Sequence, residues 1–314
     1  MQGQVWGALP VSLAARIADF DPQDLYTALD DDRLRWGTGL RGTLHLVSSE
    51  EHRFYASVAP ADWARATKQN TAGMDDLRAA VLEYAAEPRT GAELEAFCED
   101  HCDGLEPDEV EAQRKVKWRP VHRWAQLRRV PAGGTFDSKA PKLHVAAPAI
   151  PKPRDPLATV AAAHLRAFGP ATAADLAQWV GCSTEAARTA LGSHEEIARG
   201  LYDLEDAPRP DDVDAPPRFL GAFDSILLAY APKARARILP PKLADKVYNR
   251  KNLQYLPTFT LDGMIAGTWS AKGTKKRATL TLEHGPKRIP KALREEGEAL
   301  LAFLYPGAEP AVTS

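Results

Sequence analysis

The chain has 314 residues, of which 44% are hydrophobic and 26% charged, and its formal net charge is −2. This composition is typical of a globular protein long enough for two to four small domains. No stretch approaches the roughly 20 apolar residues that a membrane helix needs, and the start Met-Gln-Gly-Gln lacks the apolar core of a signal peptide. The three cysteines cannot all pair with one another, which fits a reducing compartment, so we expect a cytoplasmic protein with no membrane partner.

The small net charge hides two basic segments. Residues 233–291 contain 14 basic and three acidic residues, so this segment carries +11 while the rest of the chain carries −13. Residues 114–129 add seven Arg or Lys and no acid. This distribution favours a protein with one face that binds a polyanion, although a solvated surface balanced by ordinary salt bridges would leave the same pattern.

The N-terminal part predicts short helices followed by a strand. One helix is expected at residues 8–19, and Asp21-Pro22 is typical of the start of another, because a capping residue precedes proline at the first helical position. Residues 33–47 alternate like a strand, and Ser49 is expected to cap a long helix through Trp63. Short helices followed by strands are the element order of a winged helix.

A second group of helices precedes a turn. Helices are expected at residues 75–86, 92–101 and 108–127, with Thr90 as the cap of the middle one. A hairpin-like turn follows at residues 130–136. The element order of the N-terminal part therefore recurs.

A third group follows the stiff, proline-rich residues 148–156. An amphipathic helix is expected from Leu157 on, Thr172 is expected to cap a helix through Trp179, and another helix follows Ser183. Two short helices at this spacing predict a helix-turn-helix.

The C-terminal part is rich in strand signals. Asp262-Gly263 lies between alternating apolar runs, which is the strongest short signal for a hairpin. Residues 277–283 give another strand, residues 272–277 a basic loop, and a final helix is expected through Leu304.

Together these elements predict an α+β fold of three tandem winged-helix units with a β-rich C-terminal part. The expected domains are residues 1–70, 71–151, 152–215 and, for the β-rich part with its basic hairpin, 216–314.

Five phrases, in order along nearly the whole chain, resemble the AlkZ/YcaQ family of winged-helix DNA glycosylases. They are Gln2–Gln4, Leu40–Val47, Phe168–Asp175, Leu220–Tyr230 and Leu261–Trp269. The resemblance implies three winged helices that form a positively charged concave surface, with double-stranded DNA containing damaged bases as the partner of a monomer.

The active glycosylases of this family carry a Gln-aliphatic-Gln motif upstream of a strand like Arg41–Val47. Gln2 and Gln4 occupy the matching positions, with Gly3 in place of the larger aliphatic residue. Family members have a few tens of residues before the motif, so the first winged helix is expected to be incomplete at its N-terminus.

The resemblance implies a monofunctional glycosylase that excises N-alkylated purines without a metal or cofactor. Alkylation at N7 or N3 makes the purine a good leaving group, and neutral amides can hold the attacking water against C1′ of the sugar. We assign this role to Gln2 and Gln4. The residues expected to bind DNA are Arg41, His45, Lys272, Lys275, Lys276 and Arg277. The alternative is a winged-helix DNA-binding protein without catalysis, such as a transcriptional regulator.

Other signals favour structural roles. Cys98, His101 and Cys102 place three possible ligands within one helical turn, but structural zinc takes four, so core cysteines are expected. His45 fits a structural role at least as well as one near the DNA groove. For Asp224, helix capping or pairing with an arginine is favoured over a catalytic carboxylate.

Aromatic residues interleave with the basic block at residues 114–129. Trp118, His122 and Trp124 could stack on nucleic-acid bases, whereas tryptophans at helical spacing usually belong to the core. The core alternative is favoured.

Overall fold

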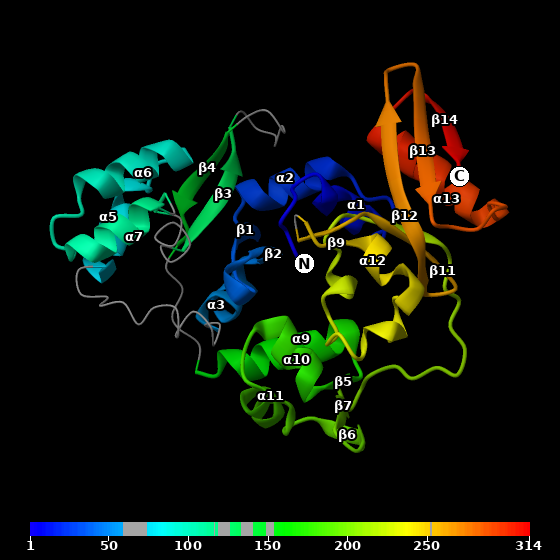
Figure 1. Cartoon of the computed structure of the whole chain (residues 1–314), viewed down its shortest axis with the longest axis horizontal. Coiled ribbons are helices and arrows are strands. Elements are labelled where there is room, and N and C mark those ends of the chain that lie inside the picture. Colours follow the sequence, from blue (N-terminus) through cyan, green and yellow to red (C-terminus); the bar gives the residue numbers. More distant parts are fainter. Residues whose placement is uncertain (59–73, 116, 119–125, 133–140, 149–153, 252) are drawn as a thin grey trace. The chain divides into compact units, whose positions relative to one another are not determined.

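Helices and mainly antiparallel strands are mixed in the computed structural model shown in Figure 1, which agrees with the combination of α and β structure expected from the sequence. The structure describes residues 1–58, 74–115, 117–118, 126–132, 141–148, 154–251 and 253–314. Contacts between residues divide the chain into two compact units. The first consists of Met1–Gln2, Pro22–Ala163 and Val180–Ser193, and the second of Gly3–Asp21, His164–Trp179 and His194–Ser314.

A four-stranded antiparallel sheet organises the first unit, with the order β2-β1-β3-β4. Its strands are β1 (Leu34–Thr38), β2 (Leu44–Ser48), β3 (Leu127–Pro131) and β4 (Lys142–Ala146). The short helix η1 (Leu40–Gly42) closes the turn between β1 and β2. The helices of this unit are α2 (Pro22–Asp30), α3 (Ser49–Ser57), α5 (Met74–Tyr84), α6 (Gly91–Asp100), α7 (Pro107–Lys115) and α11 (Thr184–Leu191).

The helices α5, α6 and α7 share a hydrophobic core with the start of β3. Leu77, Val81, Leu94, Cys98 and Trp118 are buried in it. The helix α6 begins with a capping box, in which the Thr90 side chain accepts from the backbone of Glu93 and the Glu93 side chain accepts from the backbone of Thr90.

A five-stranded sheet dominates the second unit, with the order β14-β13-β12-β11-β8. Its strands are β8 (Arg218–Leu220), β11 (Thr258–Leu261), β12 (Met264–Gly273), β13 (Arg277–Glu283) and β14 (Glu309–Thr313). All neighbours are antiparallel except β13 and β14. The helix α13 (Lys291–Leu304) packs on this sheet through Leu293, Leu300 and Leu301.

The remaining elements of the second unit are short. They are α1 (Ala8–Ala14), β6 (Glu195–Ala198), β7 (Leu201–Asp203), η2 (Ser225–Leu227), η3 (Arg235–Arg237), η4 (Pro241–Leu243), α12 (Ala244–Val247), β9 (Tyr248–Asn249) and β10 (Gln254–Tyr255). The strand β5 (Ala171–Thr172) pairs with β7, while α9 (Pro156–Phe168) and α10 (Ala173–Val180) contribute residues to both units.

Several expected elements are confirmed. Thr90 caps α6, Thr172 and Asp175 exchange capping hydrogen bonds at the start of α10, and Ser183 caps α11. Asp262 and Gly263 form the two-residue turn between β11 and β12, both with positive φ. The final helix ends at Leu304, as expected. The division into three winged helices stays a prediction.

Some expected boundaries are wrong. The helix expected at residues 8–19 ends at Ala14, after which the backbone tightens into turns. The cap of α3 is Ser48 rather than Ser49, and the part of that expected helix beyond residue 58 lies outside the described residues.

The helix expected at residues 108–127 is shorter than predicted. It ends at Lys115, because Lys117 and Trp118 both have positive φ and the Trp118 indole turns into the core. The chain is already in β3 at Leu127, and residues 119–125 lie outside the described part.

Gly221, at the end of β8, allows α1 to approach closely. A Cβ at this position would lie 2.5 Å from the carbonyl oxygen of Ala8 and 2.9 Å from Ser12 Oγ. We expect Gly221→Ala to destabilise the second unit by about 1–3 kcal/mol, because a helix backbone cannot move aside at low cost. Urea denaturation checks this. Gly7→Ala is the matched control, since a Cβ at Gly7 would meet nothing within 4 Å. Equal stability of the two variants would contradict the close packing.

Candidate functional site

Gln2 lies beside the edge strand β2 of the first unit. It forms an antiparallel bridge with His45, and Met1 and Leu46 exchange backbone hydrogen bonds of 2.9 Å in both directions. Only 6% of the Gln2 surface is exposed. The first glutamine of the motif is therefore held as an extension of the sheet.

The hydrogen bonds of Thr43 determine which end of the Gln2 side-chain amide, the nitrogen or the oxygen, faces the threonine hydroxyl. Its Nε2 donates to Thr43 Oγ1 at 3.2 Å, and that hydroxyl donates its single proton to the carbonyl oxygen of Leu40 at 2.9 Å. Because the carbonyl can only accept, the Thr43 hydroxyl has no second proton for the amide oxygen. Thr43 therefore faces the NH2 group of Gln2, and Oε1 is turned away from the hydroxyl.

His45 is fully buried next to Gln2. Its Nδ1 lies 3.0 Å from the carbonyl oxygen of Thr43, and burial lowers the pKa of His45 to about 3, so the ring is neutral at pH 7. A direct contact of this side chain with DNA stays a prediction, and its complete burial favours the structural alternative. Arg41 is half-buried in the turn before β2, with a φ of 54°, and burial lowers its pKa.

Gly37 in β1 and Gly39, between β1 and η1, make room for the side chains of two histidines. A Cβ at Gly39 would lie 3.2 Å from His45 Nδ1, and one at Gly37 would lie 3.1 Å from His52 Nε2. His52 belongs to α3, is 4% exposed, and its pKa is lowered to about 4 by burial and then by the charge of Arg35. Nothing in the sequence singled out this second buried histidine.

A cavity of about 310 Å³ opens beside His52, with Arg35 and Arg53 also in its wall. The guanidinium of Arg35 is held by Asp32, at 2.9 Å from Nε to Oδ1 and 2.7 Å from Nη2 to Oδ2. The charge of Arg35 is therefore already paired.

Gln4 belongs to the second unit and is half-buried in the turn that leads into α1. Ala8 N donates to the carbonyl oxygen of Val5, and Leu9 N donates to that of Trp6. Trp6 and Leu9 are buried, so the turn that follows Gln4 is anchored to the interior of the unit. The two glutamines thus differ in environment.

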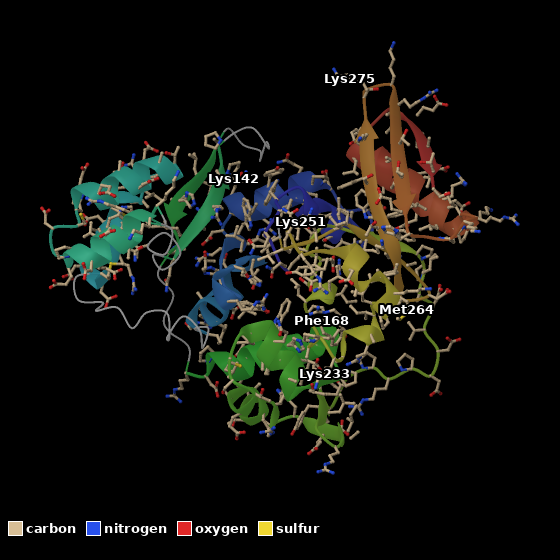
Figure 2. All side chains as sticks on the ribbon, in the orientation of Figure 1. Lys142, Phe168, Lys233, Lys251, Met264 and Lys275 are labelled. Atoms are coloured by element: carbon tan, nitrogen blue, oxygen red, sulfur yellow. The ribbon has the colours of Figure 1, made fainter. Side chains whose placement is uncertain are left out.

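The predicted basic loop is in fact the end of a hairpin. The strand β12 continues through Gly273, and β13 begins at Arg277, so only Thr274–Lys276 lie in the turn. Lys272, Lys275 and Lys276 are exposed, and Figure 2 shows Lys275 at the tip of the hairpin, pointing away from the sheet. Arg277 lies 3.6 Å from the carboxylate of Glu309 and is partly neutralised by it.

The hairpin is braced at its end. The ring of Tyr305 lies so close to Gly273 that a Cβ there would be 2.6 Å from a ring carbon. On the other side, Glu309 N donates to the carbonyl oxygen of Lys276 at 3.0 Å. The three lysines are therefore presented from an ordered backbone.

The structure resolves most of the alternatives left open by the sequence. Cys98 and Cys102 are buried core residues, as expected. Trp118 is fully buried and donates to Glu99 at 2.6 Å, so it belongs to the core. His122 and Trp124 lie outside the described residues.

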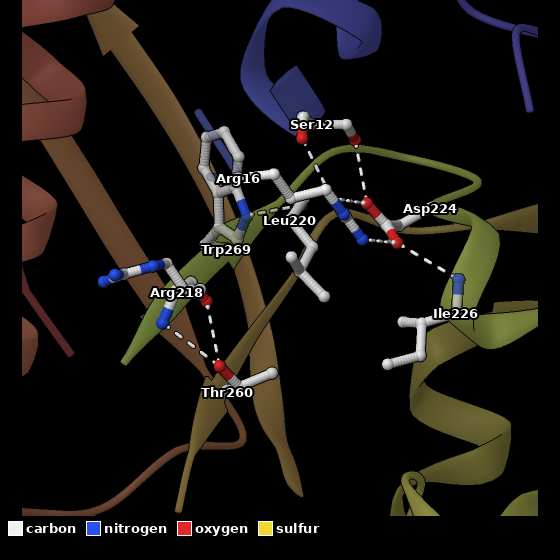
Figure 3. Close-up of polar contacts among 8 residues, drawn as sticks. All are labelled: Ser12, Arg16, Arg218, Leu220, Asp224, Ile226, Thr260 and Trp269. Carbon is white, nitrogen blue, oxygen red and sulfur yellow. Dashed lines mark hydrogen bonds and ion pairs between the residues drawn. The ribbon is translucent and has the colours of Figure 1, made fainter. Parts of the chain in front are cut away.

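Asp224 pairs with an arginine and caps a helix, as favoured from the sequence. Its partner Arg16 lies 2.7 Å away from Nη2 to Oδ1, and Ile226 N at the start of η2 donates to the same Oδ1 at 3.1 Å (Figure 3). Arg16 is 208 positions distant, so no sequence pattern could have identified it.

Within the part of the chain that the structure describes, no helix is long and apolar enough to cross a membrane.

Comparison with known proteins assigns the family. The model of the AlkZ-like DNA glycosylases matches residues 1–303, and the chain belongs to this family. This confirms the family expected from the sequence and, with it, the expected class of enzyme, a DNA glycosylase.

A curated protein and a solved structure are similar to the chain. The chain is 23% identical over 306 residues to an interstrand DNA cross-link repair glycosylase of Streptomyces sahachiroi. The aligned region covers 86% of this chain and 79% of that protein. The solved structure of the Streptomyces sahachiroi DNA glycosylase AlkZ superposes with a TM-score of 0.76 at 22% identity, over 100% of this chain and 91% of that chain. The structural similarity shows a shared fold.

The buried histidines make the stability of the first unit depend on pH. Their pKa values, about 3 for His45 and about 4 for His52, lie below the usual 6.5. Between pH 6.5 and these values the unfolded chain binds more protons, so stability falls as pH falls.

We expect each histidine to remove up to ~1.4 kcal/mol of unfolding free energy per pH unit across this window. Urea denaturation at pH 7 and pH 5 measures the loss. His52→Gln should make the unfolding free energy depend less on pH, whereas His101→Gln, which replaces an exposed ring, should not. A profile of His52→Gln as steep as that of the wild type would contradict the neutral, buried ring.

Proposed function

We propose that this protein is a monofunctional DNA glycosylase that hydrolyses the N-glycosidic bond of N-alkylated purines in double-stranded DNA. The observation that carries the proposal is the match of the AlkZ-like glycosylase family over residues 1–303, which includes the Gln2-Gly3-Gln4 motif. The name of the Streptomyces sahachiroi relative, which repairs interstrand cross-links, supports bulky alkylation products as a further substrate class.

The chemistry needs little acid catalysis. A purine alkylated at N7 or N3 is already cationic, so the bond from C1′ to N9 breaks with its electron pair going to the base, which leaves neutral. Water forms the new bond to C1′ and loses a proton to solvent. The enzyme must hold this water and stabilise positive charge on the sugar. In this proposal the amides of Gln2 and Gln4 supply the hydrogen bonds that orient the water.

The basic hairpin supplies affinity for the phosphate backbone. Lys272, Lys275 and Lys276 are exposed, and no ion pair among the described residues holds them. Lysines that neutralise phosphates release counterions, which makes affinity fall with salt whatever the DNA sequence. Arg41 remains part of the proposed DNA-binding set. Arg277, paired with Glu309, is expected to contribute less than the lysines.

The arrangement of domains is part of the same proposal. Helices followed by paired strands occur at α9, α10, α11, β6 and β7, which is the element order of the third predicted winged helix. We propose winged-helix units at residues 1–70, 71–151 and 152–215.

Replacing either glutamine should slow base excision. Gln2→Ala and Gln4→Ala remove no charge, so DNA affinity should hardly change. Loss of one water-orienting contact is worth about 2–4 kcal/mol in the transition state, or roughly a hundredfold in rate. Single-turnover release of 7-methylguanine from duplex DNA measures it.

The control for this experiment is DNA binding by the same variants. A wild-type protein that binds DNA but releases neither 7-methylguanine nor a bulkier N7 adduct would falsify the enzyme proposal. The non-catalytic DNA-binding alternative would then stand.

The hairpin lysines should determine the salt dependence of binding. We expect the triple substitution of Lys272, Lys275 and Lys276 by Gln to weaken duplex binding and to reduce the slope of log K against log salt by roughly one per lost phosphate contact. Fluorescence anisotropy at several salt concentrations measures both quantities.

A single substitution provides the matched comparison. Lys275→Gln is compared with Lys291→Gln, because Lys291 is also exposed but lies on α13 and is 3.5 Å from Glu295. If the triple variant keeps the wild-type affinity and slope, the hairpin is not part of the DNA interface.

A further inference from the structure

Asp224 is a buried carboxylate that accepts hydrogen bonds from α1, from the residues just after α1 and from the start of η2. Its side chain is 1% exposed. Ser12 Oγ and Arg16 Nη1 both donate to Oδ2 at 2.9 Å, while Arg16 Nη2 at 2.7 Å and Ile226 N at 3.1 Å donate to Oδ1. Figure 3 shows Ser12 and the guanidinium of Arg16 both facing the carboxylate of Asp224.

A second observation limits the freedom of α1. Gly221, three residues before Asp224, lies so close to the first turn of this helix that a Cβ would collide with the carbonyl oxygen of Ala8. On the same helix, Val11 packs in the core with Phe219. The helix is therefore fixed along its length, by a close backbone approach at its start and by an ion pair just beyond its end.

Gln4 is attached directly to this fixed helix. Only three residues separate Gln4 from α1. Two of these, Val5 and Trp6, accept hydrogen bonds from Ala8 N and Leu9 N at the start of the helix. A change in the tilt of α1 is therefore transmitted to Gln4 through a short, hydrogen-bonded turn. A misplacement of about 1 Å in a catalytic group can cost roughly a hundredfold in rate.

We propose that Asp224 is a positioning residue for base excision: by clamping Ser12 and Arg16 it sets the position of α1 and so of the Gln4 amide in the second unit. This inference rests on the proposed function, because it assumes that Gln4 holds the attacking water. Asp224 itself does not touch the substrate. Its oxygens are directed at Ser12, Arg16 and Ile226.

The test compares two buried aspartates of the same unit. Asp224→Asn preserves the shape of the side chain but places an NH2 group next to the guanidinium of Arg16. Because both groups can only donate, a hydrogen bond between them is lost. The matched control is Asp175→Asn. Asp175 is also fully buried and accepts from Thr172 N, Thr172 Oγ1 and Ala231 N, at the start of α10 rather than at α1.

We expect Asp224→Asn to slow single-turnover excision of 7-methylguanine at saturating DNA at least tenfold, with DNA affinity within twofold of the wild type. Asp175→Asn should lower the melting temperature but excise at the wild-type rate when measured well below it. Arg16→Lys keeps the charge but loses the bidentate geometry, so it should fall between Asp224→Asn and the wild type. If Asp224→Asn does not fold, the excision rate of Arg16→Lys tests the positioning role instead.

A double variant separates positioning from general damage. If Asp224 acts through Gln4, adding Asp224→Asn to Gln4→Ala should lower the excision rate no further than Gln4→Ala alone. Multiplicative losses, or equal slowing by Asp175→Asn, would overturn the positioning role. So would excision by Asp224→Asn and Arg16→Lys within twofold of the wild type.

The two proposals fail in different ways. If Gln4→Ala is inactive while Asp224→Asn is fully active, only the positioning role is lost. If Gln4→Ala excises as fast as the wild type, the water-holding role of Gln4 fails, and the inference about Asp224 fails with it.

Discussion

The ion pair between Asp224 and Arg16 is the constraint on which the second unit depends. A buried carboxylate is costly unless donors and an opposite charge surround it, so Asp224, whose side chain is 1% exposed, depends on Arg16. The pair joins the residues after α1 to the loop after β8, which are 208 positions apart. Through β8, it places α1 against the five-stranded sheet, where Val11 enters the same core as Phe219.

In the first unit, Thr43 organises the surroundings of Gln2. Its carbonyl oxygen accepts from Gly39 N and lies 3.0 Å from His45 Nδ1, while its hydroxyl joins the Gln2 amide to Leu40. A single threonine in the turn before β2 thus fixes the strand end, a neutral histidine and an amide together. Because the histidine is neutral at pH 7, its ring adds no positive charge to those of the nearby N-terminal ammonium and Arg41.

Local signals in the sequence predicted local structure well. The cap at Thr90 and the turn at Asp262-Gly263 were predictable because each depends on residues a few positions apart. The strand β14 was not predicted. It pairs in parallel with β13, and this pairing depends on the core that both strands share with α13, which no local pattern encodes. Its first residue is Glu309, the partner of Arg277, so the missed strand also hid the partial neutralisation of one predicted DNA-binding residue.

The candidate site was predictable as a set of residues but not as an arrangement. The family resemblance pointed to Gln2 and Gln4, yet their different burial depends on contacts with Thr43 and with α1 that no spacing encodes. Asp224 was recognised as a capping or pairing residue, while Arg16 carried no signal at all.

The bracing of the β12–β13 hairpin has a consequence for how quickly DNA could be captured. Charges on a disordered loop must be ordered during binding, which consumes part of the interaction energy. Here Tyr305 and Glu309 fix the backbone on either side of the tip, so the positive potential at Lys272, Lys275 and Lys276 exists in a defined place before any encounter. A preformed potential of this kind acts on the approaching polyanion at a distance. In the proposed complex with DNA, such a potential would raise the rate of association.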